Sequence, residues 1–357
     1  MSGGGPRSTP GAGPGKAAQA TEAAAGMLRR LRLQGLLSGR PATGPQTVHI
    51  DIANACNTRC TTCWHHSPLL TPERRPSADW LRRLLPLSAF CSILGDLRRL
   101  GGLEQVILSG MGEPFLNPDV YAMVAEARGQ GLDVTIITNL LAADLARLLS
   151  APPQPGRLDL LVSVCGASAA SWQAFHAHPR PDGFARLVEQ LAQLRRLGLA
   201  PKQVQVVNRQ NCDELPEMVR FARRTGARQV SFKLASLGGG TEAVALEPAQ
   251  QERLRRKLIP EAMALAERFD LQTDLTAFAS QIHPDPLRTA PIEQVGCYMG
   301  YLYCRITVEQ ELLFCCSTSV PVGRIDEATP LSAMWRSARY QELRDALRQG
   351  RFFPGCA

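Results

Sequence analysis

Short apolar runs alternate with amphipathic stretches through most of the chain. Each run is rich in Val, Ile and Leu and has the length of a buried strand. A stretch with apolar residues every three or four positions follows each run, which is typical of a helix packed on one face; the last such stretch covers about 248–269. The strand-like runs occupy 47–54, 103–110, 132–139, 158–164, 202–208 and 228–235.

Six strand-then-helix units predict an α/β fold built on a parallel sheet. Strands that are apolar on both sides fit such a sheet, because the crossover helices cover both of its faces. We therefore expect a complete or partial barrel, in which functional groups lie in the loops at the carboxyl ends of the strands.

The two ends of the chain have a different character. Residues 1–26 are mostly Gly, Ala and Pro, so we expect a disordered leader, followed by a short basic amphipathic helix within 1–45. Residues 46–290 hold the alternating pattern. From residue 291 the pattern changes to a β-hairpin and a helix, which predicts a small cysteine-rich module over 291–357.

Charge and hydropathy exclude two classes of partner. The net charge of the 357 residues is +8, but 1–45 contribute six basic residues against one acid, which is +5 and leaves +3 for the other 312 residues. The body is therefore nearly balanced, and nucleic acid is not an expected partner. No apolar run approaches the roughly 18 residues of a membrane span, and no secretory signal is present. We expect a cytoplasmic protein without a membrane partner.

Three cysteines lie in the loop after the first strand-like run, on the expected functional face. In a reducing compartment, cysteines are more often metal ligands or catalytic groups than disulfides, and this chain has eleven. A structural zinc site would need a fourth ligand, which His65 or His66 would have to supply. Three thiolates also suit a four-iron, four-sulfur cluster in which one iron stays open for another ligand. The three residues are Cys56, Cys60 and Cys63.

The spacing C-x3-C-x2-C in this loop resembles that of the radical S-adenosylmethionine (SAM) superfamily. The resemblance implies a partial (β/α)6 TIM-type barrel over roughly 46–240, with Cys56, Cys60 and Cys63 as ligands of a 4Fe-4S cluster. It also implies that the amino and carboxylate groups of SAM bind the open iron. Reduction then cleaves SAM to a 5′-deoxyadenosyl radical, which abstracts a hydrogen atom from the substrate.

A second motif, "SGMGEP" at 109–114, follows the second strand-like run. It resembles the family's Gly-Gly-Glu-Pro-like motif, which implies that Gly112, Glu113 and Pro114 contact the amino group of SAM. A carboxylate there can accept a charge-assisted hydrogen bond from an ammonium, and glycine permits a close backbone approach.

Polar residues at three further strand ends resemble family positions for SAM. These are Asn139, Ser163 and Asn211, and each is equally well explained as a helix cap or a turn residue. The chain departs from the family pattern at Thr62, where an aromatic residue is usual, and at Cys165, where aspartate is frequent. For Cys165 we favour a small buried hydrophobe.

The C-terminal cysteines resemble the first auxiliary cluster of the SPASM and twitch extensions found behind radical SAM barrels. The resemblance implies one auxiliary 4Fe-4S cluster, in which Cys316 is the alternative to Cys315 as a ligand. Zinc bound by the same cysteines is the other possibility for this site. The implied ligands are Cys297, Cys304, Cys315 and Cys356.

These resemblances imply a radical SAM enzyme, which we expect to be an oxidoreductase that modifies a peptide or protein. A small-molecule or carbohydrate dehydrogenase is the runner-up. A non-enzymatic iron-sulfur or zinc redox sensor is the alternative of another class, and a SAM motif argues against it. The expected partners are a peptide or small-molecule substrate and a reducing protein such as flavodoxin or ferredoxin.

Overall fold

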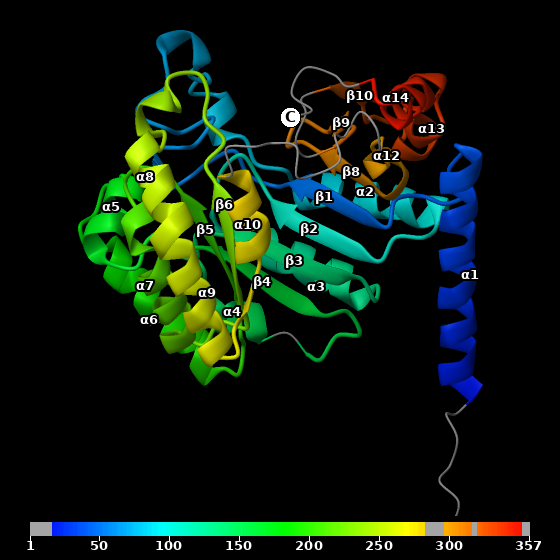
Figure 1. The fold of residues 1–357 in the computed structure, drawn as a ribbon. Coiled ribbons are helices and arrows are strands. Elements are labelled where there is room, and N and C mark those ends of the chain that lie inside the picture. Colours follow the sequence, from blue (N-terminus) through cyan, green and yellow to red (C-terminus); the bar gives the residue numbers. More distant parts are fainter. Residues whose placement is uncertain (1–15, 151, 283–295, 316–319, 352–357) are drawn as a thin grey trace, which may run out of the picture.

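Six parallel strands form the centre of the structure, a computed structural model that describes residues 16–150, 152–282, 296–315 and 320–351. The strands follow the six apolar runs, so the predicted partial barrel is confirmed (Figure 1). Each strand pairs in parallel with the next one along the chain. Their bounds are β1 (Thr47–Asp51), β2 (Gln105–Ser109), β3 (Asp133–Thr138), β4 (Leu158–Ser163), β5 (Lys202–Val207) and β6 (Gln229–Leu234).

Helices follow the strands and bury their apolar faces against them. In α2 (Leu87–Leu100), for example, Phe90, Ile93, Leu94 and Leu97 are almost fully buried. The last pattern, 248–269, is two α-helices joined by a π-helical turn at Leu254–Leu258. The remaining helices are α3 (Val120–Gly129), α4 (Leu145–Leu149), α5 (Ala169–His176), α6 (Gly183–Arg196), α7 (Leu215–Arg224), α8 (Pro248–Arg253), α9 (Ile259–Arg268) and α10 (Leu275–Gln281); short 3-10 turns occupy Pro72–Arg74, Trp80–Arg82, Pro114–Leu116, Cys212–Glu214 and Thr241–Val244.

The C-terminal hairpin extends the central sheet. Its first strand, β8 (Tyr303–Ile306), pairs in parallel with β1, and β9 (Glu311–Leu313) then pairs antiparallel with β8 and with β10 (Pro321–Arg324). The short β7 (Gln272–Thr273) lies at the other edge. The result is one open ten-stranded sheet in the order β10-β9-β8-β1-β2-β3-β4-β5-β6-β7.

The C-terminal helices pack on the barrel. Two short helices stand where the pattern predicted one, because Ser337 interrupts the helix and caps the next one. Asp96 on α2 accepts hydrogen bonds from the backbone N–H and the hydroxyl of Ser332, at 3.0 and 2.8 Å. The helices are α12 (Met299–Leu302), α13 (Leu331–Trp335) and α14 (Ala338–Arg348).

The N-terminal helix is longer than the sequence indicated. The expectation of a disordered leader is wrong for residues 16–26, which belong to α1 (Lys16–Ser38). Six alanines in this stretch explain the difference, because alanine has the highest helix propensity. Arg32 on α1 donates to the Gly102 carbonyl at 2.6 Å, which ties the helix to the sheet end. None of the helices in the described ranges is long and apolar enough to cross a membrane.

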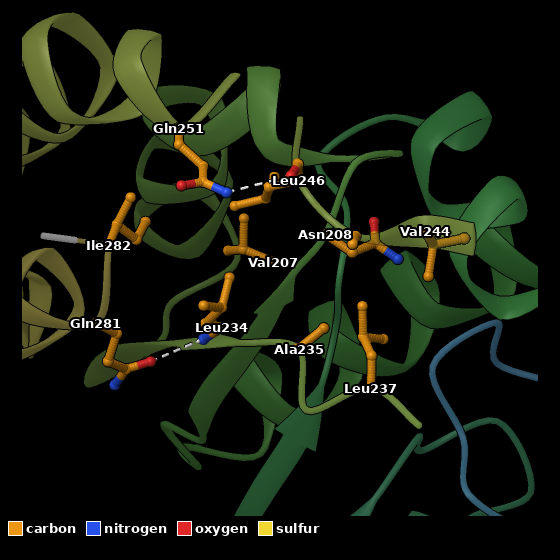
Figure 2. Close-up of a pocket in the computed structure, with 11 residues that line it drawn as sticks. Val207, Asn208, Leu234, Ala235, Leu237, Val244, Leu246, Gln251, Gln281 and Ile282 are labelled. Carbon is orange, nitrogen blue, oxygen red and sulfur yellow. Dashed lines mark hydrogen bonds between the residues drawn. The ribbon is translucent and has the colours of Figure 1, made fainter. Parts of the chain in front are cut away.

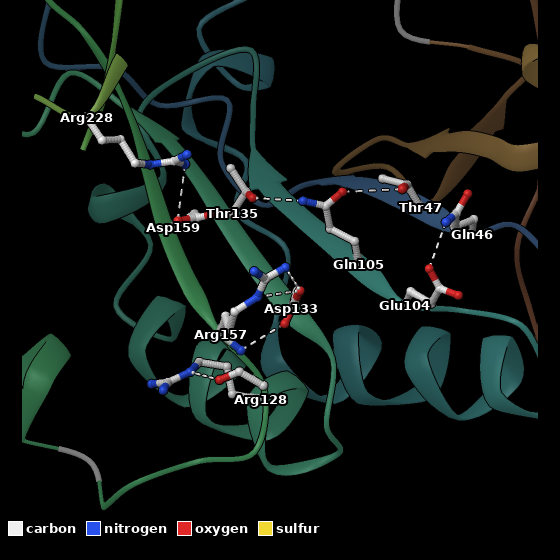
Figure 3. A network of polar contacts seen from close by, with 11 residues as sticks. Gln46, Thr47, Glu104, Gln105, Arg128, Asp133, Thr135, Arg157, Asp159 and Arg228 are labelled. Carbon is white, nitrogen blue, oxygen red and sulfur yellow. Dashed lines mark hydrogen bonds and ion pairs between the residues drawn. The ribbon is translucent and has the colours of Figure 1, made fainter. Parts of the chain in front are cut away.

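A polar network lies at the amino ends of the strands, opposite the expected functional face (Figure 3). The guanidinium of Arg157 bonds Asp133 at 2.6 Å, and Arg228 bonds Asp159 at 3.2 Å. Both pairs are exposed, so solvent screens them and they add little to stability.

Candidate functional site

The cysteine loop leaves β1 at the carboxyl end of the sheet and is held from two sides. The backbone N–H groups of Arg59 and Thr61 donate to the carbonyls of His176 and Phe175 in α5, at 3.0 and 2.8 Å. On the other side, the indole N–H of Trp64 donates to the Ser236 carbonyl after β6, at 2.9 Å. The loop therefore spans the end of the sheet, from α5 to the end of β6.

The three thiols lie within this loop, and two of them share a hydroxyl. Thr58 Oγ1 is 3.4 Å from Cys56 Sγ and 3.5 Å from Cys60 Sγ. Cys63 Sγ accepts from the backbone N–H groups of His65 and His66, at 3.5 and 3.3 Å. Hydrogen bonds of this kind stabilise a thiolate and tune the potential of an iron-sulfur site.

Burial raises the pKa of all three thiols, to about 11 for Cys56. Without a metal they therefore stay protonated, whereas a coordinating thiol loses its proton to the charge of the metal. Three thiols fit a 4Fe-4S cluster, in which each cysteine binds a different iron. Within the described ranges, no three His, Cys, Asp or Glu side chains converge closely enough for a single metal ion.

The two histidines of the loop make other contacts. His66 Nε2 is 2.9 Å from the Asn54 carbonyl, and the His65 ring lies 4.9 Å from that of Trp80. Burial lowers the pKa of His65 to about 4, so its ring is neutral.

Glu113 is buried directly beside the loop. Its carboxylate accepts from the Thr138 hydroxyl at 2.5 Å, from the Asn139 backbone N–H at 2.7 Å and from the Phe115 backbone N–H at 3.2 Å. Burial nevertheless raises its pKa to about 7. An ionised carboxylate has about four acceptor positions, so one remains for a ligand.

Two glycines of the same motif allow the strand end to touch the cysteine loop. A Cβ at Gly110 would lie 1.9 Å from the Ala53 carbonyl oxygen, and one at Gly112 would lie 2.0 Å from that of Ala55. The backbone N–H of Gly112 donates to Ala53 at 3.0 Å. The glycines are thus required by the approach of two protein backbones, a reason that the sequence did not reveal.

The other three polar candidates differ in what they contact. Asn139 donates to Asn57 Oδ1 at 2.7 Å, which links the end of β3 to the cysteine loop. Ser163 is half-buried at the end of β4. Asn211 donates to the carbonyls of Cys165 and Val206, so it stabilises a turn. Cys165 itself is fully buried, as expected for a small hydrophobe.

A buried ion pair beneath the loop was not predicted. Arg305 on β8 donates to both carboxylate oxygens of Asp51 on β1, at 2.9 and 3.1 Å, and its Nη2 lies 3.4 Å from Met111 Sδ. His49 bonds the Tyr303 hydroxyl across the same two strands at 2.9 Å. The sequence feature that could have predicted this pair is a charged residue inside an apolar strand, because such a residue is rarely buried without a partner.

Three of the C-terminal cysteines belong to the main hydrophobic core or pack against it. Cys304 on β8 is fully buried, whereas Cys297 and Cys315 are half-buried at the margin of the same core. Burial raises the pKa of Cys304 to about 12. Cys316 and Cys356 lie outside the described residues.

A cavity of about 280 Å³ lies at the carboxyl ends of β5 and β6, and Figure 2 draws the residues that line it. Its walls are mainly apolar, with Leu237 and Val244 among them, and Asn208 and Gln251 add amide groups. Leu237 follows Ser236, whose backbone carbonyl accepts the Trp64 indole N–H, so one lining residue is next in sequence to a contact of the cysteine loop.

Comparison with known proteins found proteins similar to this chain in sequence and others similar to it in structure. No protein-family model matches the chain. A 237-residue stretch is 27% identical to the PqqA peptide cyclase of Methylorubrum populi, covering 60% of this chain and 56% of that protein. The chain thus spans little more than half the length of this relative.

Solved structures share the fold over most of the chain. SuiB of Streptococcus suis, bound to S-adenosylmethionine, has a TM-score of 0.64 and 17% identity, covering 88% of this chain and 71% of that one. SuiB has also been solved with its precursor peptide SuiA. For anSMEcpe with bound AdoMet, the TM-score is 0.63 and the identity 12%, with 85% and 84% covered. The chain is thus similar in sequence to a PqqA peptide cyclase, and its fold is similar to those of SuiB and anSMEcpe, both of which have been solved with bound S-adenosylmethionine.

Proposed function

We propose that the chain cleaves SAM reductively and uses the resulting radical to abstract a hydrogen atom from a peptide. The observation that carries this proposal is the loop that holds Cys56, Cys60 and Cys63 next to the buried carboxylate of Glu113. The three thiols would hold a 4Fe-4S cluster, which when bound supplies the electron for cleavage. Glu113 would accept the amino group of SAM, with Gly112 and Pro114 shaping its approach.

The neighbouring polar residues would position SAM. Asn139 bonds both the cysteine loop and the Glu113 carboxylate, so it would hold these two parts in register. We propose that Ser163, at the next strand end, faces the ligand.

The similarities support a peptide substrate, because one relative is named PqqA peptide cyclase and SuiB has been solved with a bound precursor peptide. The cavity of Figure 2 gives an apolar side chain room at the carboxyl ends of β5 and β6. Oxidation of that peptide is the reaction we favour, since a second cluster would take up the electron left on a substrate radical.

The proposal is tested with protein reconstituted anaerobically with iron and sulfide. Dithionite and SAM should yield 5′-deoxyadenosine, and short peptides encoded beside the gene should lose two hydrogen atoms in mass. Absence of 5′-deoxyadenosine from fully loaded protein would contradict the assignment. A product from a nucleotide or sugar in place of a peptide would move it to the small-molecule class.

Replacement of Glu113 by Gln should weaken SAM binding about ten- to a hundred-fold. The variant keeps the shape but loses the charge, and a hydrogen bond to a charged group contributes about 1.5–3 kcal/mol. Because the pKa of Glu113 is about 7, wild-type affinity should also rise from pH 6 to pH 8 as the carboxylate forms. Equilibrium binding of SAM to cluster-loaded protein measures both effects. An equal pH dependence in Glu113→Gln would exclude this carboxylate as its source.

We further propose one auxiliary 4Fe-4S cluster on Cys297, Cys304, Cys315 and Cys356. Reconstituted protein should then hold about eight irons, and a triple alanine variant of Cys56, Cys60 and Cys63 should retain about four, since each cluster needs its own ligands. Metal analysis decides between this and the alternative. Zinc, or no iron, in the triple variant would remove the auxiliary cluster and the argument for oxidation.

A further inference from the structure

A second cavity, of about 460 Å³, opens beside Cys56 on the side of the loop that faces α5. Residues 56–59 form one wall, and residues between 178 and 186, which follow α5, form another. It shares no residue with the cavity of Figure 2. The cavity beside Cys56 is therefore separate from the cavity at the ends of β5 and β6.

The rim of this second cavity is basic. Arg59, Arg180 and Arg186 line it together with a single acid, Asp182, and all four are exposed. Arg180 pairs with Asp182 through Nε at 3.0 Å and Nη2 at 2.5 Å, which neutralises that acid. Arg186 donates through Nε to the Leu141 carbonyl at 2.6 Å, which orients it without cancelling its charge. Two positive charges thus remain at the opening.

A cluster at the cysteine loop has to receive one electron for each SAM that it cleaves. Electron transfer slows steeply with distance, so the donor must approach a cluster ligand closely. Cys56 is such a ligand in the proposed function, and it lines a cavity with an exposed rim. A donor bound here would leave the cavity at the ends of β5 and β6 free for substrate, because the two cavities share no lining residue.

We propose that this basic-rimmed cavity beside Cys56 is the docking site of a small acidic protein that carries a one-electron donor at its surface. The proposal rests on the function proposed above. In the transfer, the carrier is oxidised by one electron and the cluster is reduced by one, and no bond forms or breaks. Complementary charge fits such a partner, because electrostatic steering speeds association, and interfaces of electron-transfer proteins are small.

The test compares two reductants on the same cluster-loaded protein. Dithionite is a small molecule that needs no docking site, whereas a reduced bacterial flavodoxin serves as the acidic carrier. The variant is Arg59→Glu with Arg186→Glu. A matched control reverses two exposed arginines outside the cavity, Arg268→Glu with Arg336→Glu, which changes the net charge equally.

At low salt, the charge-reversed variant should lose about ten-fold or more in flavodoxin-driven SAM cleavage, within the range of electrostatic steering. Its rate with dithionite should stay within about two-fold of wild type, and the defect should shrink at high salt because salt screens exposed charges. Titration of flavodoxin should show a weaker Kd for this variant. The control should behave as wild type in each measurement.

Three results would overturn the docking site. The first is an unchanged rate of flavodoxin-driven SAM cleavage in the charge-reversed variant. The second is an equal loss of its rate with dithionite, which would mean damage to the loop. The third is an equal loss of the flavodoxin-driven rate in the control variant, which would mean a response to net charge alone. If wild-type protein does not cleave SAM with dithionite, the proposed function fails instead. The flavodoxin titration then decides the docking site by itself, and unchanged binding by the charge-reversed variant rejects it.

Discussion

Replacement of Cys60 by Ala should abolish reductive cleavage of SAM. Cys60 is the middle ligand of the proposed cluster, and its thiol shares the Thr58 hydroxyl with Cys56. Two remaining thiols cannot hold three irons, so the cluster should be lost or unable to transfer an electron. The measurement is 5′-deoxyadenosine formed under dithionite after anaerobic reconstitution, for which we expect a loss of about a thousand-fold or more, equivalent to roughly 4 kcal/mol in the barrier.

Cys91→Ala provides the matched control. Cys91 is a half-buried thiol of α2, outside the cysteine loop, so its removal should leave the cleavage rate unchanged. Iron bound to the C-terminal cysteines should persist in both variants. Wild-type production of 5′-deoxyadenosine by Cys60→Ala would show that the loop does not hold the catalytic cluster.

The second large effect is expected from Arg305→Met, which should lower the free energy of unfolding by about 3–5 kcal/mol. Arg305 bonds both oxygens of Asp51, and the Asp51 carboxylate is fully buried. Burial already raises the pKa of Asp51 to about 6 against the opposing effect of Arg305. Removing the cation therefore leaves a buried acid without its charged partner. Denaturant unfolding of the apo protein measures the loss.

A double variant, Asp51→Leu with Arg305→Met, distinguishes the pair from the packing around it. Replacement of a buried ion pair by apolar residues of similar size is often neutral or stabilising, so the double variant should regain most of the lost stability. An unfolding midpoint of Arg305→Met equal to that of wild type would show that the pair does not hold β8 against β1.

Most of the barrel and the proposed cluster ligands could be predicted from sequence. Strands buried on both faces are continuous apolar runs, and β1 to β6 all lie within such runs because local hydrophobicity determines them. The spacing of Cys56, Cys60 and Cys63 is local as well, since all three belong to one loop. The hairpin of β8 and β9 was predictable for the same reason.

Contacts between distant parts of the chain were decided only by the tertiary structure. The pattern at 291–357 indicated a separate module, yet β8 pairs with β1 across about 250 residues, and Arg305 meets Asp51 there. Two of the three donors to Glu113 come from the end of β3, and the carbonyls that require Gly110 and Gly112 belong to the cysteine loop. The rim arginines beside Cys56 follow α5. Local periodicity determines which residues form strands and helices. The hydrogen-bond donors to a buried carboxylate, the backbone that lies against a glycine and the surroundings of an exposed cation depend instead on which distant segments the tertiary fold brings together.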